Sequence, residues 1–212
     1  MPKEDVIYLA DKKNSPYGTK SIDEIISLTK KDINRLARMG ADKILIACCT
    51  ASSVHDRLDG WEREISIPII TPASRVAAGY ASVAVIATRH TVRQSAFGSA
   101  IRSLAPSCRV LERSEQELVG LVEGGCRDEN INQRCKEILR SVAEWVEESA
   151  ADALVLGCTH FSHLEKTLGD MLPRVKIISP AREGARALAS LPSFSDGSGR
   201  IIYTDSSGVG LK

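Results

Sequence analysis

The chain has 212 residues, with 28 Lys and Arg against 27 Asp and Glu, so its net charge is +1. This balance gives no electrostatic case for nucleic acid or an acidic membrane surface as a partner. A hydrophobic content of 43% with 26% charged residues is typical of a soluble globular protein, and no apolar run reaches the length of a membrane span.

The first part of the chain alternates apolar runs with helical patterns. A strand is expected over residues 6–10, followed by a loop to residue 19. Ser21 and Glu24 have the spacing of a capping box, and apolar residues then repeat at helical spacing until Gly40. Further strands are predicted at 43–48 and 68–70, with helices from about 51 and over 74–80.

The second part repeats this alternation. Strands are predicted at 83–87, 108–111, 154–158 and 175–178. Capping pairs are predicted to open three helices, at Thr91 and Gln94, Ser114 and Glu117, and Ser162 and Glu165, and a long amphipathic helix is expected over 132–150. A polar segment over 193–199 precedes one last candidate strand at 200–203. Strands that alternate with helices predict an α/β fold with parallel sheets covered on both faces, and a domain boundary is expected near Ser82.

Two of the predicted strands end in the same way. Each apolar run stops at a cysteine that small or hydroxylic residues follow, in Leu45-Ile46-Ala47-Cys48-Cys49-Thr50 and in Val155-Leu156-Gly157-Cys158-Thr159-His160. A thiol there lies at the carboxyl edge of a sheet, where ligands bind in open α/β folds. It also lies near the N-terminus of the next helix, whose free N–H groups stabilise a thiolate. The two strands therefore predict a pair of acid/base groups on opposite faces of one small substrate.

These stretches resemble the two cysteine signatures of glutamate racemase, within the aspartate/glutamate racemase superfamily. A third match is Tyr8-Leu9-Ala10-Asp11, followed by Pro16-Tyr17-Gly18-Thr19-Lys20-Ser21, and the order and spacing agree with that family over most of the chain. The resemblance implies two similar α/β domains with the active site in the cleft between them. Residues 1–81 with 181–212 would form the first domain, and residues 82–180 the second.

The resemblance also implies roles for individual residues. Cys48 would take the α-proton from the D-isomer and Cys158 from the L-isomer, while His160 would orient Cys158 or share its proton. The implied substrate-binding residues are Pro16, Tyr17, Gly18, Cys49, Thr50, Thr159 and His160. Glu123 aligns with a family acid near the active site, and could equally be a charge at a helix end.

The chemistry implied by this resemblance needs one thiolate and one thiol at a time. A free cysteine has a pKa near ~8.5, and a helix N-terminus can lower it by about one unit, or roughly 1.4 kcal/mol. No cofactor is needed, and no Gly-rich phosphate-binding loop argues for one. Zinc is not expected either, because adjacent cysteines are poor chelators and no C-x-x-C spacing is present. Cys108, Cys126 and Cys135 lack any motif and are expected to be structural.

Two departures from the family pattern bear most directly on the site. Glutamate racemases open with a strand that ends in Asp-Ser-Gly, and this chain is expected to begin after it. The run Ile201-Ile202-Tyr203-Thr204-Asp205-Ser206-Ser207-Gly208 resembles that opening, so Asp205 and Ser206 are candidates to fill its place, as in a circular permutation. Cys49 stands where the family has asparagine, and a thiol is a weaker hydrogen-bond donor than an amide.

Three functions stay open at this point. The resemblance favours a cofactor-independent glutamate racemase that supplies D-glutamate for peptidoglycan. A racemase for aspartate, a hydantoin or a malonate derivative would use the same chemistry, and a truncated or degenerate homologue would bind an acidic metabolite with little catalysis. Six cysteines without an apolar signal segment indicate reduced thiols in the cytoplasm. An exposed sheet edge would favour association into a homodimer.

Overall fold

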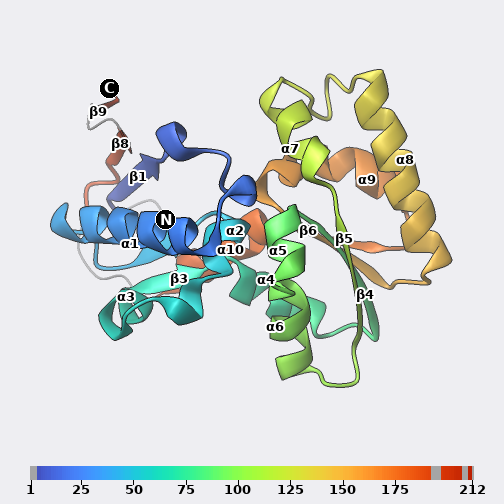
Figure 1. The fold of residues 1–212 in the computed structure, drawn as a ribbon, viewed down its shortest axis with the longest axis horizontal. Helices are drawn as coiled ribbons and strands as arrows, with labels where there is room; N and C mark the ends of the chain where they lie inside the picture. The colour runs from blue at the N-terminus through green and yellow to red at the C-terminus, as the bar shows by residue number, and fades with distance from the viewer. Residues whose placement is uncertain (1–3, 192–196, 207–209, 212) are drawn as a thin grey trace.

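The computed structural model describes residues 4–191, 197–206 and 210–211. The early strands and α1 form one lobe, and the segments from β4 to α9 form the other (Figure 1). The fold is α/β with mainly parallel sheets, as the sequence predicts. None of the described helices is both long enough and apolar enough to cross a membrane.

The second lobe is built on a four-stranded parallel sheet. Its strands, in the order β5-β4-β6-β7, are Arg109–Ser114, Ser82–Ala87, Ala153–Gly157 and Lys176–Ile178. Every residue of β4 and β6 is buried, because helices cover both faces of the sheet. Alternate side chains of β4 and β6 join two separate core clusters.

Helices cover the two faces of this sheet. One core cluster includes residues of α7 (Gln116–Glu123), α8 (Gln133–Glu148) and α9 (Glu165–Met171). The other includes residues of α4 (Ile70–Ala77) and α6 (Ala96–Leu104). Helix α4 precedes the boundary predicted near Ser82, but its buried residues pack on the second sheet. The two predicted domains therefore share core contacts across that boundary. The division into 1–81 with 181–212 and 82–180 stays a prediction.

The first lobe contains two smaller sheets. In one, β1 (Val6–Ala10) pairs in parallel with β8 (Ile201–Asp205), and β8 pairs antiparallel with β9 (Gly210–Leu211). In the other, β2 (Ile44–Ile46) pairs in parallel with β3 (Ser66–Pro68). The remaining helices of this lobe are α1 (Ile22–Arg38), α2 (Cys49–Ser52) and α3 (Gly60–Ile65).

Two predicted helix starts are confirmed by their hydrogen bonds. The Ser21 hydroxyl accepts from the Glu24 backbone N–H, and the Glu24 carboxylate accepts from the Ser21 N–H, which completes the capping box of α1. The Asn132 side chain accepts from the Cys135 N–H at the start of α8. Helix α1 ends just before Gly40, whose φ of 92° lies in the left-handed region that glycine tolerates.

Three other predicted helix starts are wrong. Thr91 lies inside α5 (Arg89–Arg93), because Thr88 caps that helix three residues earlier. Ser114 is the last residue of β5, and α7 follows it without a side-chain cap. Ser162 lies inside the 3₁₀ turn η4 (Thr159–Leu164), where its hydroxyl donates to the Thr159 carbonyl, so α9 begins only at Glu165. A Ser or Thr followed by an acid or amide three residues later is therefore a weak signal by itself, since a neighbouring hydroxyl, a longer strand or a 3₁₀ turn can displace the helix start.

Helix α10 (Pro180–Ala189) lies between the two lobes in the view of Figure 1. Gly184 on α10 is close enough to Ile69 that an added Cβ would lie 2.8 Å from Ile69 Cγ1 and 3.3 Å from Leu45 Cδ2. The absence of a side chain at residue 184 thus lets α10 pack directly on the segment after β3 and on β2.

Candidate active site

The two cysteine strands end in matching backbone geometry. Cys48 follows β2 and is the N-cap residue of α2, with φ −141° and ψ 120°. Cys158 follows β6 and is the N-cap residue of η4, with φ −139° and ψ 135°. Each strand therefore passes directly into a helical turn, and each thiol lies where the free N–H groups of that turn are within reach.

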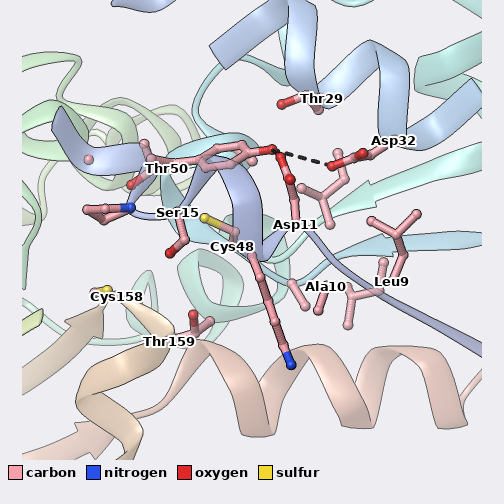
Figure 2. Close-up of a pocket in the computed structure, with 18 of the residues that line it drawn as sticks. Leu9, Ala10, Asp11, Ser15, Thr29, Asp32, Cys48, Thr50, Cys158 and Thr159 are labelled. Atoms are coloured by element: carbon pink, nitrogen blue, oxygen red, sulfur yellow. Dashed lines mark hydrogen bonds between the residues drawn. The ribbon is translucent and has the colours of Figure 1, made fainter. Parts of the chain in front are cut away.

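Both cysteines line one cavity of about 400 Å³. Residues of both lobes contribute to it, and Figure 2 shows Cys48, Ser15, Thr159 and Cys158 gathered around the same space. Its lining also includes most of the residues that the resemblance implies, namely Pro16, Tyr17, Gly18, Thr50 and His160. Small-molecule sites usually have volumes of about 300–1,000 Å³, so a substrate the size of an amino acid is compatible with this space.

Burial raises the pKa of both thiols. For Cys48 it outweighs the N–H groups of Ala51 and Thr50, which act in the opposite direction. The pKa of Cys158 is raised to about 12, by burial first and then by the charge of Cys48, against the N–H groups of His160 and Phe161. The N–H groups of the helical turns thus lower the pKa of the thiols, as predicted, but burial has the larger effect.

His160 connects Cys158 to a carboxylate. Its Nδ1 lies 3.6 Å from the Cys158 Sγ, and its Nε2 lies 3.3 Å from Glu123 Oε1. The same Glu123 oxygen accepts a hydrogen bond of 3.4 Å from the Ser15 hydroxyl of the other lobe. Glu123 therefore contacts the site through His160 and Ser15, although it is not among the residues that line the cavity.

Hydroxyl groups join the lobes on the side of Cys48. The Thr50 Oγ1 lies 3.0 Å from Thr88 Oγ1 and 3.4 Å from Thr91 Oγ1, and all three residues are buried. Next to them, a Cβ added to Gly18 would lie 3.0 Å from both Thr88 Cβ and Gln116 Oε1. The loop with Pro16, Tyr17 and Gly18 is thus packed against the second lobe, which fixes it over the cavity.

An acidic cluster that the sequence analysis did not single out lies in the same cavity. The Tyr17 hydroxyl donates to Asp11 Oδ2 at 2.7 Å and lies 3.3 Å from Asp32 Oδ2, as Figure 2 shows for Asp32. The pKa of Asp32 is raised to about 6, by burial first and then by the charge of Asp11. Thr29, one turn before Asp32 on α1, has a buried hydroxyl with no hydrogen-bond partner among the residues that the structure describes. The helical spacing of Ile25, Thr29 and Asp32 could have indicated that Asp32 shares the inner face.

Besides Glu123, three predicted site residues lie outside the cavity lining. Cys49 is 1% exposed and belongs to the core beneath α2. Asp205 pairs in register with Ala10, and the Ser206 hydroxyl accepts a hydrogen bond from the Lys13 N–H. Ser207 and Gly208 lie outside the described residues. The roles of Cys49, Asp205 and Ser206 stay predictions. Within the described ranges, no group of three or more His, Cys, Asp or Glu side chains is placed to hold a metal ion.

Comparison with known proteins places this chain in a family. The family model described as Asp/Glu/Hydantoin racemase matches residues 1–188. The chain belongs to this family. It is therefore an enzyme of the racemase class, an isomerase. The glutamate racemase of Desulforudis audaxviator is 34% identical over 192 residues, which cover 88% of this chain and 69% of that protein. The glutamate racemase of Deinococcus radiodurans is 37% identical over 171 residues, 77% of this chain and 57% of that protein.

Solved structures of the family share the fold. A glutamate racemase from Thermus thermophilus, in complex with β-chloro-D-alanine, has a TM-score of 0.74 at 28% identity, covering 97% of this chain and 78% of that one. A glutamate racemase from Francisella tularensis, in complex with D-glutamate, has a TM-score of 0.83 at 24% identity, with 97% and 79% covered. The resemblance on which the sequence analysis relied is thus confirmed for family and fold.

Proposed function

We propose that this racemase interconverts L- and D-glutamate, with Cys48 and Cys158 as its two bases and without a cofactor. The observation that carries the proposal is the matched pair of thiols: two cysteines with similar backbone geometry line one cavity, and each follows a strand of its own parallel sheet. The choice of glutamate is supported by relatives that are named glutamate racemase and are 33–34% identical over about 90% of the chain.

The proposed reaction moves one proton off the α-carbon and another onto its opposite face. With D-glutamate bound, the Cys48 thiolate takes the α-proton, and the electron pair of the C–H bond stays on the α-carbon, shared with the carboxylate. The Cys158 thiol then donates its proton to the other face. The product is L-glutamate, with Cys48 left as thiol and Cys158 as thiolate, and the reverse reaction begins at Cys158.

The electrostatic interaction between the two cysteines favours one thiolate and one thiol at a time. The charge of Cys48 raises the pKa of Cys158, so two thiolates at once are disfavoured. Each thiolate would be stabilised by the N–H groups of its own helical turn, from Thr50 and Ala51 for Cys48 and from His160 and Phe161 for Cys158. A buried thiolate is also a stronger base than an exposed one, as removal of a weakly acidic α-proton requires.

The surrounding residues would bind and orient the substrate. Thr50, Thr159 and the loop over residues 16–18 line the cavity and offer hydroxyl and backbone groups to the carboxylates and the ammonium group. His160, held by Glu123, would orient Cys158 or exchange its proton. In a cytoplasm with a peptidoglycan pathway, the product D-glutamate would serve the cell wall.

A direct assay tests the proposal. Purified protein is incubated with L-glutamate, D-glutamate, L-aspartate and D-aspartate in separate reactions, and circular dichroism follows the loss of optical activity. We expect racemisation of both glutamate isomers and slower or no change with aspartate. Calorimetry with both glutamate isomers would identify a protein that only binds. If folded protein binds glutamate but forms none of the opposite isomer, the proposal is wrong.

Cysteine variants test whether the racemase activity depends on Cys48 and Cys158. Cys48→Ser and Cys158→Ser should each lower kcat by about 10²–10⁴-fold, the usual contribution of a general acid or base. Cys108→Ser is the matched control, because Cys108 is buried as Cys158 is but lies just before β5, outside the cavity lining. Equal activities for all three variants would remove the thiols from the mechanism.

A further inference from the structure

Gln116 lines the cavity from the second lobe and has no part in the proposed proton transfer. It is the first residue of α7 and lies two residues after the end of β5. Because β5 pairs in parallel with β4, and β4 with β6, Gln116 lies at the same carboxyl edge of the sheet as Cys158. Its side chain is therefore placed to contact a molecule bound between the two cysteines.

The hydrogen bond that Gln116 accepts fixes the orientation of its amide group. Its Oε1 accepts from the backbone N–H of Arg89 at 3.1 Å. A backbone N–H group can only donate, so the amide oxygen must face Arg89 and the amide nitrogen must face away from it. Within the described part of the chain, that nitrogen has no hydrogen-bond acceptor. The Gln116 NH₂ group can thus donate to a bound molecule.

Gln116 belongs to a group of polar residues at one end of the cavity. A Cβ added to Gly18 would lie 3.0 Å from Gln116 Oε1 and 3.0 Å from Thr88 Cβ, so Gly18 packs against both residues. Thr88 Oγ1 in turn lies 3.0 Å from the Oγ1 of Thr50, two residues after Cys48. All of these residues except Cys48 form what we call the donor end: Gly18, Thr50, Thr88 and Gln116. The donor end offers hydroxyl and amide groups but no carboxyl group.

The carboxyl groups of the cavity lie elsewhere. Among the described residues, those that line it are Asp11 and Asp32, and both lie within hydrogen-bond distance of the Tyr17 hydroxyl. Figure 2 shows Thr50 and Asp32 on opposite sides of the cavity. Since like charges repel, a substrate carboxylate is disfavoured near the two acids and favoured at the donor end. The ammonium group of the substrate has the opposite preference.

We propose that the Gln116 amide binds the side-chain carboxylate of glutamate and selects it over an uncharged side chain. The α-carboxylate is attached to the reacting carbon and stays beside the helical turns of the two cysteines, so the side-chain carboxylate is the one that reaches Gln116. A hydrogen bond to a carboxylate is about twice as strong as one between neutral groups. Because the Arg89 N–H already holds the amide, little conformational freedom is lost on binding. The assignment rests on the proposed function, since it takes glutamate as the substrate.

Lys12 is the alternative partner for this carboxylate. Among the described residues, it is the one Lys or Arg that lines the cavity. It directly follows Asp11 in the turn η1 (Lys12–Asn14), so its side chain starts beside the acids rather than at the donor end. Lys12 is also exposed, and within the described chain neither a hydrogen bond nor an ion pair holds its ammonium group. The fixed amide of Gln116 is therefore the better-defined site, and Lys12→Gln is included in the test.

Substitutions at Gln116 test the assignment through the choice between glutamate and glutamine. Gln116→Glu keeps an oxygen for the Arg89 N–H and replaces the NH₂ group by a second oxygen, so the side chain is ionised at pH 8. We expect it to raise the Kd for glutamate about 10- to 100-fold and to lower the preference for glutamate over glutamine at least about tenfold. Gln94→Glu is the matched control, because Gln94 is exposed at the end of α5 and outside the cavity lining. Calorimetry gives the Kd values, and circular dichroism gives kcat and KM.

A second variant separates substrate binding from a structural role. Gln116→Met has neither donor nor acceptor, so it also loses the contact with Arg89. If Gln116 binds the carboxylate, both Gln116 variants should lower the preference for glutamate, while Gln94→Glu should retain it. If Gln116 only holds Arg89, Gln116→Met should weaken binding of glutamate and glutamine alike and Gln116→Glu should leave both unchanged. That second pattern would overturn the assignment.

Three further results would overturn the assignment. They are an equal preference for glutamate in Gln116→Glu and the unmodified protein, a preference that Lys12→Gln removes and Gln116→Glu does not, and no binding of glutamate by the folded, unmodified protein. Binding of glutamate without racemisation would refute the proposed function alone, because the ratio of the Kd values for glutamate and glutamine would still test Gln116. This ratio compares two ligands in the same variant, so a partial loss of folded protein does not alter it.

Discussion

The Tyr17 hydroxyl donates a 2.7 Å hydrogen bond to Asp11, and a second carboxyl group, that of Asp32, lies 3.3 Å from the same oxygen. A phenol has one proton to donate, so it cannot satisfy two carboxylates at once. The arrangement is favourable when Asp32 is protonated and donates to the Tyr17 oxygen. This agrees with the pKa of Asp32, which burial and the charge of Asp11 raise to about 6.

The first prediction concerns stability against pH. The pKa of Asp32 is about 6 in the folded protein and 3.8 without these influences, so the folded state binds more protons between these values. Stability should therefore fall as pH rises from about 4 to 6. Asp32→Asn should flatten that fall and stabilise the protein at pH 7, as urea unfolding at several pH values would measure. Asp42→Asn, at an exposed position of the same lobe, should leave the slope unchanged. A steeper fall in Asp32→Asn would contradict this account.

The second prediction concerns the loop over the cavity. Gly18→Ala places a methyl group 3.0 Å from Thr88 Cβ and Gln116 Oε1, closer than carbon atoms normally approach. The loop must then shift, at a cost of about 1–3 kcal/mol. We expect a higher KM for glutamate together with a lower Tm. Gly60→Ala is the control, because nothing lies within 4 Å of its added Cβ. Equal KM values for the two variants would show that the loop does not position the substrate.

The third prediction concerns Glu123. Its contact with His160 is partly exposed, with 33% and 44% of the two side chains accessible, and such pairs usually contribute about 0.2–1 kcal/mol. Glu123→Gln should therefore lower kcat by only about two- to fivefold, chiefly with L-glutamate, whose proton goes to Cys158. Glu144→Gln, on the exposed face of α8, should have no effect. A loss as large as that of Cys158→Ser would make Glu123 a catalytic residue rather than a positioning one.

The fourth prediction concerns the pH dependence of the rate. Burial raises the pKa of both thiols, to about 12 for Cys158. Because the reactive form has one thiolate, kcat/KM should rise steadily with pH through the range in which the protein stays folded. Initial rates by circular dichroism at a series of pH values give the profile. A plateau beginning below about pH 7 would show a base with a pKa much lower than a buried thiol has.

The sequence predicted local and repeated features of this fold well. The strand over 6–10, the cap at Ser21 and the two cysteine strands depend on short-range pattern, and the structure has each of them. The helix start predicted at Thr91 is wrong because Thr88, three residues earlier, caps the same helix. The burial of Asp32 depends on Tyr17 and Asp11, which reach it only through tertiary folding. The pairing of β1 with β8 likewise joins distant segments, which no local pattern encodes.

Solvent exchange at the α-carbon tests the two-thiol account most directly. In deuterium oxide, the unmodified protein should place deuterium mainly in the product isomer, because the incoming proton comes from the second thiol. Cys158→Ser retains Cys48 alone, so it should exchange the α-proton of D-glutamate slowly without inverting it, and Cys48→Ser should do so only for L-glutamate. Proton NMR of recovered glutamate measures both. Continued racemisation in either variant, or exchange of both isomers by one cysteine, would contradict the assignment of one thiol to each face.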